Sequence, residues 1–327
     1  MKTFVTGATG FIGASIVREL LHDGREVRVL VRSTSNLSNL KGLDVEIVTG
    51  DLLDADGLCR GLKGCDVLYH AAADYRLWTR NSDEMYRTNV GGTTAILEAA
   101  LESNLSRVIY TSSVGTLGNP GDGTAGNEET KVSLADMVGP YKKSKFLAER
   151  EAERFIARGL PLIIVNPSTP VGPWDIKPTP TGKIIVDFLK RKMPAYLDTG
   201  LNLIAVEECA RGHILAEHKG AIGRKYILGN ANLSLREIFT MLQDITGLSA
   251  PKVRLPYTPV LIAAWLNEGL SRITGREPLI PLSGVRMAAH HMYFDSGRAV
   301  RELGLPQTPV TEALKRAVEW FRNNNYA

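Results

Sequence analysis

The sequence has few cysteines, few aromatic residues and no long apolar run, and each shortage excludes a class of protein. Its three cysteines, Cys59, Cys65 and Cys209, form no CxxC pair, which argues against a disulfide framework or a zinc site and fits a reducing compartment. The apolar run at 260–266 is too short to cross a bilayer, and the N-terminal MKTFVTGATGFIG has no small-residue cleavage site after it. We therefore expect a soluble, cytoplasmic protein without a transmembrane segment.

A strong excess of charge is also lacking. The 39 lysines and arginines against 35 aspartates and glutamates give a net charge of +4, and the basic residues are scattered along the chain. This distribution does not indicate a nucleic-acid partner. With 44% hydrophobic and 23% charged residues over 327 positions, the chain has the composition of a globular protein and is long enough for two lobes.

Short apolar strands alternate with amphipathic helices through the first half of the chain. Residues 2–6, 11–22 and 26–31 are typical of a strand, a helix and a second strand. The pattern continues with strands predicted at 45–48, 67–69, 107–111 and 162–165 and with helices at 55–62, 82–103 and 141–158. This alternation predicts an α/β fold with a Rossmann-type, doubly wound parallel sheet and right-handed crossovers.

The second half is less regular. Residues 115–139 are rich in Gly, Asn and Asp, and residues 166–182 contain five prolines. Beyond them the sequence predicts a strand at 225–228 and helices at 234–246, 260–274, 284–291 and 311–323. We expect a nucleotide-binding Rossmann core over 1–168, to which 202–230 returns, and a smaller, mostly helical substrate-binding lobe over 169–327.

A glycine motif lies at the start of the first helix. Gly7, Gly10 and Gly13 form G-x-x-G-x-x-G directly after the first predicted strand. A turn of this kind brings backbone N–H groups and the positive end of a helix against a pyrophosphate, with no Cβ in the way. The strand before it and the helix after it support the motif. The alternative is a glycine-rich helix entry that binds nothing.

The residue at the end of the second predicted strand indicates which dinucleotide binds. Sites for NAD usually have Asp or Glu about 20 residues beyond the glycines, where it accepts bonds from the ribose hydroxyls. Here that position is Arg32, followed by Ser33, Thr34 and Ser35. A guanidinium stabilises a 2′-phosphate, which favours NADP(H) over NAD. Arg32 could instead be a solvated charge at the strand end.

A tyrosine and a lysine are the candidate catalytic pair. Tyr141 and Lys145 are four positions apart on a predicted helix, so their side chains share a face. Thr111, Ser112 and Ser113 follow the predicted strand at 107–111, at the sheet edge where ligands of such folds bind, although they could also form only a turn. A cation near a phenol lowers its pKa from about 10, which would let Tyr141 exchange a proton with an alcohol.

Several further motifs extend over the whole chain. They are TGATGFIG at 6–13, GDLLD at 50–54, HAAA at 70–73, NVGGT at 89–93, YTSS at 110–113, YKKSK at 141–145 and FDSGRAVRELG at 294–304. Together they resemble the extended short-chain dehydrogenase/reductase family, also called the NAD-dependent epimerase/dehydratase family. This resemblance implies a homodimer formed through helices on the flank of the sheet, although no apolar stripe in the sequence identifies that interface.

The resemblance also assigns roles to residues. Ser113 would bind the substrate oxygen, Tyr141 would donate or accept the proton, and Lys145 would hold the nicotinamide ribose and lower the pKa of Tyr141. Asn89 would brace the helix that carries them. The cofactor-binding residues implied in this way are Gly7, Thr9, Gly10, Phe11, Ile12, Gly13, Arg32, Asp51, Leu52, Ala71, Ala72, Ala73, Asn89, Tyr141, Lys145 and Pro167.

Within the family the chain is most similar to the dihydroflavonol-reductase-related branch and, more narrowly, to bacterial proteins named hopanoid-associated sugar epimerases. The segments that carry this likeness are ADYRLW at 73–78, NPSTPVGP at 166–173, KPTPTGKIIVDFL at 177–189 and MPAYLDTGLNLI at 193–204. Sugar-nucleotide enzymes of the family commonly have an N-x-Y-G-P-type run where this chain has NPSTPVGP. That departure argues against nucleotide-sugar recognition.

The substrate itself is less well indicated. Candidate contacts are Tyr75, Arg76, Trp78, Trp174 and Lys177, because aromatic and cationic groups suit a ring or an anion, but the two tryptophans could simply close the core between lobes. His70 is interpreted as a structural histidine, and no metal site is expected. The first hypothesis is an NADP(H)-dependent oxidoreductase acting on a small or lipid-linked carbonyl or alcohol. The alternatives are a sugar or nucleotide-sugar epimerase or dehydratase with a retained cofactor, and a non-catalytic NADP sensor.

Overall fold

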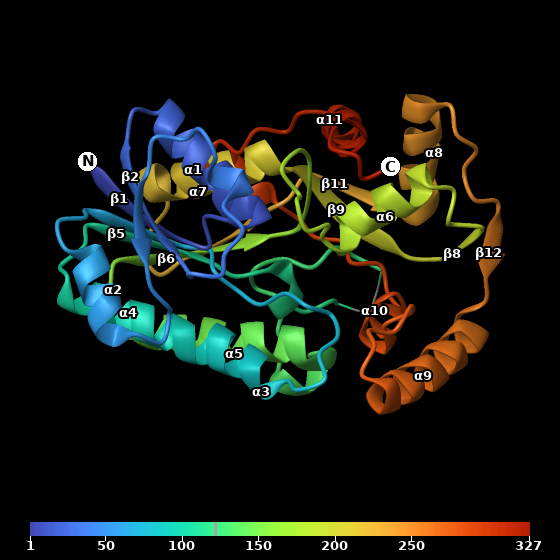
Figure 1. Cartoon of the computed structure of the whole chain (residues 1–327), viewed down its shortest axis with the longest axis horizontal. Helices are drawn as coiled ribbons and strands as arrows, with labels where there is room; N and C mark the ends of the chain where they lie inside the picture. Colours follow the sequence, from blue (N-terminus) through green and yellow to red (C-terminus); the bar gives the residue numbers. More distant parts are fainter. Residues whose placement is uncertain (121–122) are drawn as a thin grey trace.

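A seven-stranded parallel sheet forms the larger part of the computed structural model, which describes residues 1–120 and 123–327 (Figure 1). The strand order is β10-β6-β5-β4-β1-β2-β3, so the order reverses between β1 and β4. In such a sheet a crevice opens beyond the carboxyl ends of the strands at that point. The predicted Rossmann-type fold is confirmed, with β1 at Lys2–Thr6, β2 at Glu26–Val31, β3 at Glu46–Thr49, β4 at Val67–His70, β5 at Arg107–Thr111, β6 at Leu162–Pro167 and β10 at Lys225–Leu228.

Helices cover both faces of this sheet. One face packs against α1 (Phe11–His22) and α7 (Val206–Lys219), and the other against α2 (Ala55–Leu62), α4 (Gly92–Glu102) and α5 (Gly139–Ala157), as Figure 1 shows. The central strands are buried apolar runs, as expected of a sheet covered on both sides. The helix predicted at 82–103 is divided into α3 (Asp83–Tyr86), a π-helical turn (Arg87–Gly91) and α4.

Much of the chain after residue 168, apart from α7 and β10, forms a second lobe with its own core. Its helices α6 (Pro180–Leu189), α8 (Leu235–Thr246) and α11 (Val310–Asn323) enclose Phe188, Phe239 and Phe321. The start of α8 follows from local sequence, because Ser234 and Glu237 form a capping box. The sequence analysis predicted neither α6 nor a three-stranded sheet of β7 (Thr169–Val171), β9 (Gly200–Ala205) and β11 (Ala231–Ser234).

Two further helices lie at the edge of this lobe. They are α9 (Tyr257–Thr274) and α10 (Leu282–Met287), and they follow a small sheet of β8 (Ala195–Leu197) and β12 (Val253–Leu255). The helix predicted at 284–291 was placed slightly too late, because it begins directly after Pro281. Among the helices of the described residues, none combines the length and the hydropathy needed to cross a bilayer.

The long loop predicted at 115–139 is fastened to the C-terminal part of the chain. The backbone N–H of Gly126 donates to the carbonyl of Tyr293 (2.9 Å), and the N–H of Asp295 donates back to Gly126 (2.9 Å). Two 3-10 turns, Val114–Thr116 and Leu134–Asp136, lie toward its ends. Residues 121 and 122 of this loop lie outside the described residues.

Candidate active site

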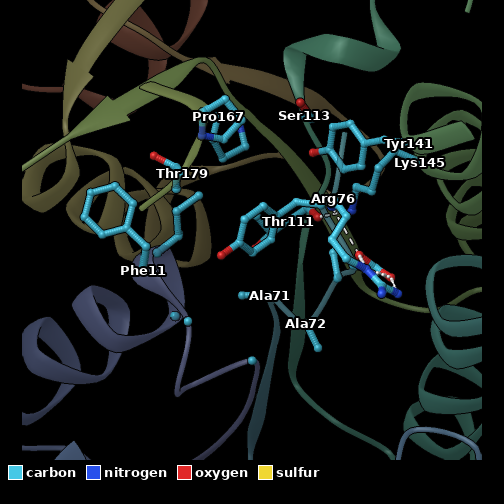
Figure 2. Close-up of a pocket in the computed structure, with 18 of the residues that line it drawn as sticks. Phe11, Ala71, Ala72, Arg76, Thr111, Ser113, Tyr141, Lys145, Pro167 and Thr179 are labelled. Atoms are coloured by element: carbon cyan, nitrogen blue, oxygen red, sulfur yellow. Dashed lines mark hydrogen bonds and ion pairs between the residues drawn. The ribbon is translucent and has the colours of Figure 1, made fainter. Parts of the chain in front are cut away.

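A cavity of about 1110 Å³ opens at the carboxyl ends of β1, β4, β5 and β6, between the sheet and the second lobe. Figure 2 shows Ser113, Tyr141 and Lys145 on one side of it and Phe11 and Thr179 on the other. Pockets for one small ligand typically enclose about 300–1,000 Å³. The cavity therefore has room for a dinucleotide together with part of a second molecule.

The glycine motif forms one end of the cavity. Gly7 has φ +76°, and a Cβ there would lie 2.5 Å from the backbone nitrogen of Ala72. A Cβ on Gly13 would lie 2.1 Å from the carbonyl oxygen of Gly7. Gly10 is the N-cap of α1 and supplies no side-chain cap, so the first N–H groups of the helix are left for a ligand. This geometry fits a pyrophosphate, and the predicted neighbours Thr9, Phe11, Ile12, Ala71, Ala72 and Ala73 also line the cavity.

Arg32 lies on the cavity wall directly after β2. Its backbone N–H donates to Ser35 Oγ (3.1 Å), and its side chain is exposed. In the part of the chain that the structure describes, no ion pair to Arg32 is found. The guanidinium is thus available to an anion, and Asp51 and Leu52 line the same end of the cavity.

Tyr141 and Ser113 meet at the centre of the cavity. Tyr141 is near the start of α5, and Ser113 follows β5. Burial raises the pKa of Tyr141, and a hydrogen bond with Ser113 lowers it in part. A phenol with a raised pKa carries its proton at neutral pH and can donate it to a bound oxygen. Pro167, at the end of β6, lines the cavity close by (Figure 2).

Lys145 lies one helical turn further along α5 and is buried. Its Nζ donates to the carbonyl oxygen of Thr111 (2.8 Å) and to Tyr110 Oη (3.2 Å). Burial lowers the pKa of Lys145 to about 8, against the opposing charge of Glu149. The sequence suggested that Lys145 lowers the pKa of Tyr141, but the structure shows that pKa raised. The reason is that burial dominates at Tyr141, while the ammonium of Lys145 is engaged by β5.

A buried carboxylate that the sequence analysis missed lies behind this pair. Glu149, one further turn along α5, is fully buried and accepts hydrogen bonds from Asn166 Nδ2 (2.9 Å) and from Ser112. Lys225 of β10 forms an ion pair with it. Burial acts to raise the pKa of Glu149, but Lys225 and the hydrogen bonds outweigh it, so the net shift is downward. Its spacing of four from Lys145 was the available signal in the sequence.

The Glu149 cluster also positions Ser113. Asn166 Nδ2, which donates to Glu149, lies 3.0 Å from the backbone carbonyl of Ser113 as well. Thr116 Oγ1 lies 2.7 Å from that carbonyl and 2.7 Å from the Glu149 carboxylate. The backbone of Ser113 is therefore fixed through Asn166 and Thr116, which both contact the buried Glu149 carboxylate.

Asn89 was expected among the cofactor-binding residues, but it does not line the cavity. It is buried, its Oδ1 accepts from the backbone N–H of Asp74 (2.7 Å), and its Nδ2 donates to Ser144 Oγ (2.9 Å). These bonds join α5 to the loop after β4. Both polar atoms of the Asn89 side chain bind protein groups. Asn89 therefore braces α5 and makes no contact with the cavity.

The predicted substrate residues divide into two groups. Tyr75, Arg76 and Lys177 line the cavity. Trp174 does not: the guanidinium of Arg18 lies 3.9 Å from the centre of its ring, and Asn39 Nδ2 donates to its carbonyl (3.1 Å).

Trp78 is half-buried but lies off the cavity lining as well. Trp174 contacts Trp320 of α11 in addition to α1, with ring centres 6.5 Å apart. Trp174 therefore lies between α1 and α11, 37% exposed, and it does not line the cavity.

The wall opposite Tyr141 contains residues that were not among the candidate substrate contacts. Asp175 is 2% exposed, and burial raises its pKa to about 6 although Thr179 donates to it from its N–H (2.8 Å) and from its Oγ1 (2.8 Å). The rest of this wall is mainly apolar and is formed by segments far apart in the sequence, including Ile176, Pro180, Ile184, Leu201, Leu235, Met287 and Met292. Such a wall suits an apolar ligand.

The histidine at the end of β4 has a structural role. The ring nitrogens of His70 lie 2.7 Å from Thr6 Oγ1 and 3.0 Å from Thr93 Oγ1. Burial lowers the pKa of His70 to about 3, so the ring is neutral. Both nitrogens are occupied, in agreement with the interpretation from the sequence. Among the described residues there is no cluster of His, Cys, Asp and Glu able to hold a metal.

Comparison with known proteins gives consistent matches. Residues 3–229 match the model of the NAD dependent epimerase/dehydratase family. The chain is 48% identical to a candidate dihydroflavonol 4-reductase from Synechocystis sp., over 99% of this chain and 95% of that protein. It is 34% identical to sterol demethylase protein B from Methylococcus capsulatus, over 98% of each. The crystal structure of a nucleoside-diphosphate-sugar epimerase from Pseudomonas aeruginosa superposes with a TM-score of 0.84 at 27% identity, covering 100% of this chain and 99% of that one.

Proposed function

This chain belongs to the NAD-dependent epimerase/dehydratase family, and from that premise we propose that it is an NADP(H)-dependent oxidoreductase. It reduces a carbonyl group, or oxidises the corresponding alcohol, on an apolar or lipid-linked substrate. The observation that carries this proposal is the meeting of Ser113, Tyr141 and Lys145 in one cavity with the glycine motif at its end.

The chain supplies the proton chemistry of the reaction. A bound nicotinamide provides the acceptor or donor of the hydride. Ser113 Oγ hydrogen-bonds the reacting oxygen of the substrate, and Tyr141 Oη transfers the proton to or from it. Burial raises the pKa of Tyr141, so the phenol carries its proton at neutral pH and can donate it to the substrate oxygen during carbonyl reduction. Lys145, held by Thr111 and Tyr110, keeps a positive charge beside the nicotinamide ribose.

Arg32 is the basis for proposing NADP(H). Its unpaired guanidinium at the end of β2 can form a charge-assisted contact with a 2′-phosphate, whereas a free ribose hydroxyl offers it no comparable partner. In this proposal residues 1–168, together with the returning segment 202–230, hold the cofactor. The rest of 169–327 holds the substrate, and two chains associate through helices on the flank of the sheet.

The apolar wall supports a hydrophobic substrate. The apolar lining residues Ile176, Pro180, Ile184, Leu201, Leu235, Met287 and Met292 make up much of the wall, beside polar residues that include Asp175, Lys177 and Thr179. Two relatives, at 48% and 34% identity, carry names that refer to polycyclic compounds, a dihydroflavonol and a sterol. We extend this substrate class to the present chain as part of the proposal.

An epimerase is the second candidate. The family description and the structural likeness to a nucleoside-diphosphate-sugar epimerase favour it. An epimerase would return the hydride to its own substrate and retain its cofactor through purification. The NPSTPVGP run at 166–173, where sugar-nucleotide enzymes commonly have N-x-Y-G-P, makes this the weaker candidate.

One experiment separates the two. The purified chain is mixed with panels of steroid, flavonoid and isoprenoid ketones and of nucleotide-sugars, with NADPH or NADH, while nucleotide oxidation and isomer formation are both recorded. We expect NADPH oxidation with an apolar ketone. Isomer formation without added nucleotide and without net oxidation would reject the oxidoreductase in favour of the epimerase.

A further inference from the structure

Helix α9 has two apolar sides, of which the fold covers one. Tyr257, Val260, Leu261 and Ala264 pack against α10. At about 100° per residue, Ile262, Leu266, Leu270 and Ile273 lie on the side of α9 turned away from α10, and Trp265 lies at the border of that side. These five residues are the α9 stripe, and all of them are exposed.

The exposure of the α9 stripe is large. Trp265 is 64% exposed and Ile273 is 84% exposed, and the turn that follows α9 adds Leu279 at 88%. Single exposed apolar residues are common in proteins, but a continuous stripe of them marks a surface that binds something. A helix that is apolar on both sides is normally buried on both.

The charges around the stripe indicate what covers it. Residues 252–286 contain five basic side chains, Lys252, Arg254, Arg272, Arg276 and Arg286, against two acidic ones, Glu268 and Glu277. Arg254 and Arg272 form ion pairs with Asp198 and Glu268, and among the described residues no ion pair is found for the other three basic side chains. Apolar helices flanked by basic residues bind at the surface of anionic membranes, and tryptophan is favoured at the level of the lipid headgroups. We propose that α9 and the turn after it form a membrane-binding surface, with the α9 stripe inserted among the headgroups of an anionic bilayer.

The position of α9 connects this surface with the cavity. Leu282 and Val285 of α10 face α9, whereas Gly284 and Met287 line the cavity. Ser283 Oγ donates to the carbonyl of Leu77 (2.7 Å), which ties α10 to the loop after β4. Figure 1 shows α9 and α10 together at one corner of the molecule, on the side of the second lobe. A chain bound through α9 therefore holds the rim of its cavity close to the lipids, and α10 is the element between them.

The proposal that α9 binds a membrane does not depend on the proposed function. The idea that the membrane delivers an apolar substrate to the cavity rests on that function. An apolar ketone dissolved in a bilayer could enter a cavity held against the membrane without crossing bulk water. The test below uses neither nucleotide nor substrate, so its outcome does not depend on whether the oxidoreductase proposal holds.

The test is sedimentation of the full chain with sucrose-loaded vesicles. Vesicles of phosphatidylcholine alone are compared with vesicles that also contain phosphatidylglycerol. The variant L266E/I273E places two charges on the α9 stripe, and I47E/I222E makes the same change at two exposed isoleucines elsewhere, on β3 and after α7. Circular dichroism checks that both variants are folded.

We expect the unmodified chain and I47E/I222E to bind the phosphatidylglycerol vesicles, and more weakly as salt is raised. L266E/I273E should bind at least about tenfold more weakly, because two apolar side chains no longer leave water. No binding by the unmodified chain, or equal binding to the uncharged vesicles, would overturn the proposal. So would a dimer in sedimentation velocity that L266E/I273E converts to a monomer, since a second copy would then cover the stripe.

Discussion

The two sides of the cavity are held in place by different kinds of contact. The α5 wall, which carries Ser113, Tyr141 and Lys145, is backed by Glu149, an acid whose pKa is lowered by its pairing with Lys225. The α6 wall consists of Asp175, Lys177 and Thr179, which directly precede α6. Its buried acid is Asp175, and burial raises the pKa of this acid to about 6. Asp175 accepts its hydrogen bonds from Thr179, which is neutral.

Because of this difference, the two walls respond differently to a change in pH. A buried carboxylate beside a cation stays ionised across neutral pH and keeps its hydrogen bonds. A buried carboxylate held by neutral donors gains a proton near its raised pKa. The α5 wall therefore keeps its buried charge through neutral pH. In the α6 wall, Asp175 gains a proton as the pH falls through about 6, so the charge of that wall depends on pH.

A matched pair of tyrosines gives the largest test of this comparison. Tyr141→Phe removes the proton donor and should lower kcat by about 100- to 10,000-fold while cofactor binding stays within a few-fold. Tyr75→Phe on the opposite side removes one 3.3 Å hydrogen bond to the carbonyl of Lys177 and should cost less than about tenfold, mainly in KM. Steady-state kinetics and a nucleotide titration measure both effects.

Cofactor binding by Tyr141→Phe is the control for correct folding. Equal losses in kcat for the two variants would contradict the assignment of the chemistry to the α5 wall. Full turnover by Tyr141→Phe would remove the proposed mechanism altogether.

A matched pair of arginines tests the cofactor. Arg32→Ala should raise the KM for NADPH by about 10- to 100-fold and leave the KM for NADH unchanged, because a charge-assisted contact to the 2′-phosphate is lost. Arg76→Ala should leave the preference between the nucleotides as it is, since Arg76 is paired with Asp74 and Glu84. An equal rise in the KM values for NADPH and NADH in Arg32→Ala would show that the Arg32 guanidinium does not recognise the 2′-phosphate.

Substitutions of the two buried acids, Glu149 and Asp175, should have smaller effects than those of Tyr141 and Arg32. The effect is expected in the pH dependence of kcat/KM. Lys145 has a lowered pKa of about 8, so its charge is present below that pH and is lost above it. We therefore expect kcat/KM to fall as the pH rises through about 8. Glu149→Gln removes the charge that raises the pKa of Lys145, which moves the fall to lower pH and costs up to about fivefold at pH 8 for a shift of one pH unit.

Asp175→Asn is the matched control, because an amide oxygen can still accept from Thr179. It should change the KM for substrate and leave the fall near pH 8 in place. An unchanged pH profile in folded Glu149→Gln would mean that Glu149 does not tune Lys145. Thermal unfolding of both variants shows whether either change acts only through stability.

The sequence indicated the regular part of the fold closely. The predicted bounds of β1, α1, β2, α2, β5 and β10 agree with the structure to the residue, because each is a short segment with one clear hydrophobic period. The π-helical turn at Arg87–Gly91 and the short strands of the second lobe were missed. Their residues show no period of their own, and their pairing partners lie far along the chain.

By itself, the sequence determined the glycine turn, the basic residue after β2 and the spacing of Tyr141 and Lys145, since all of these depend on backbone geometry within a few residues. Only the tertiary structure decided what surrounds them. Glu149 meets Lys225, 76 positions away, and Trp174 turns to Arg18 instead of to the cavity. Likewise, the composition of α9 shows that it is apolar but not which side is covered. Burial and pKa depend on which distant segments exclude water from a side chain, and a local pattern carries no record of those neighbours.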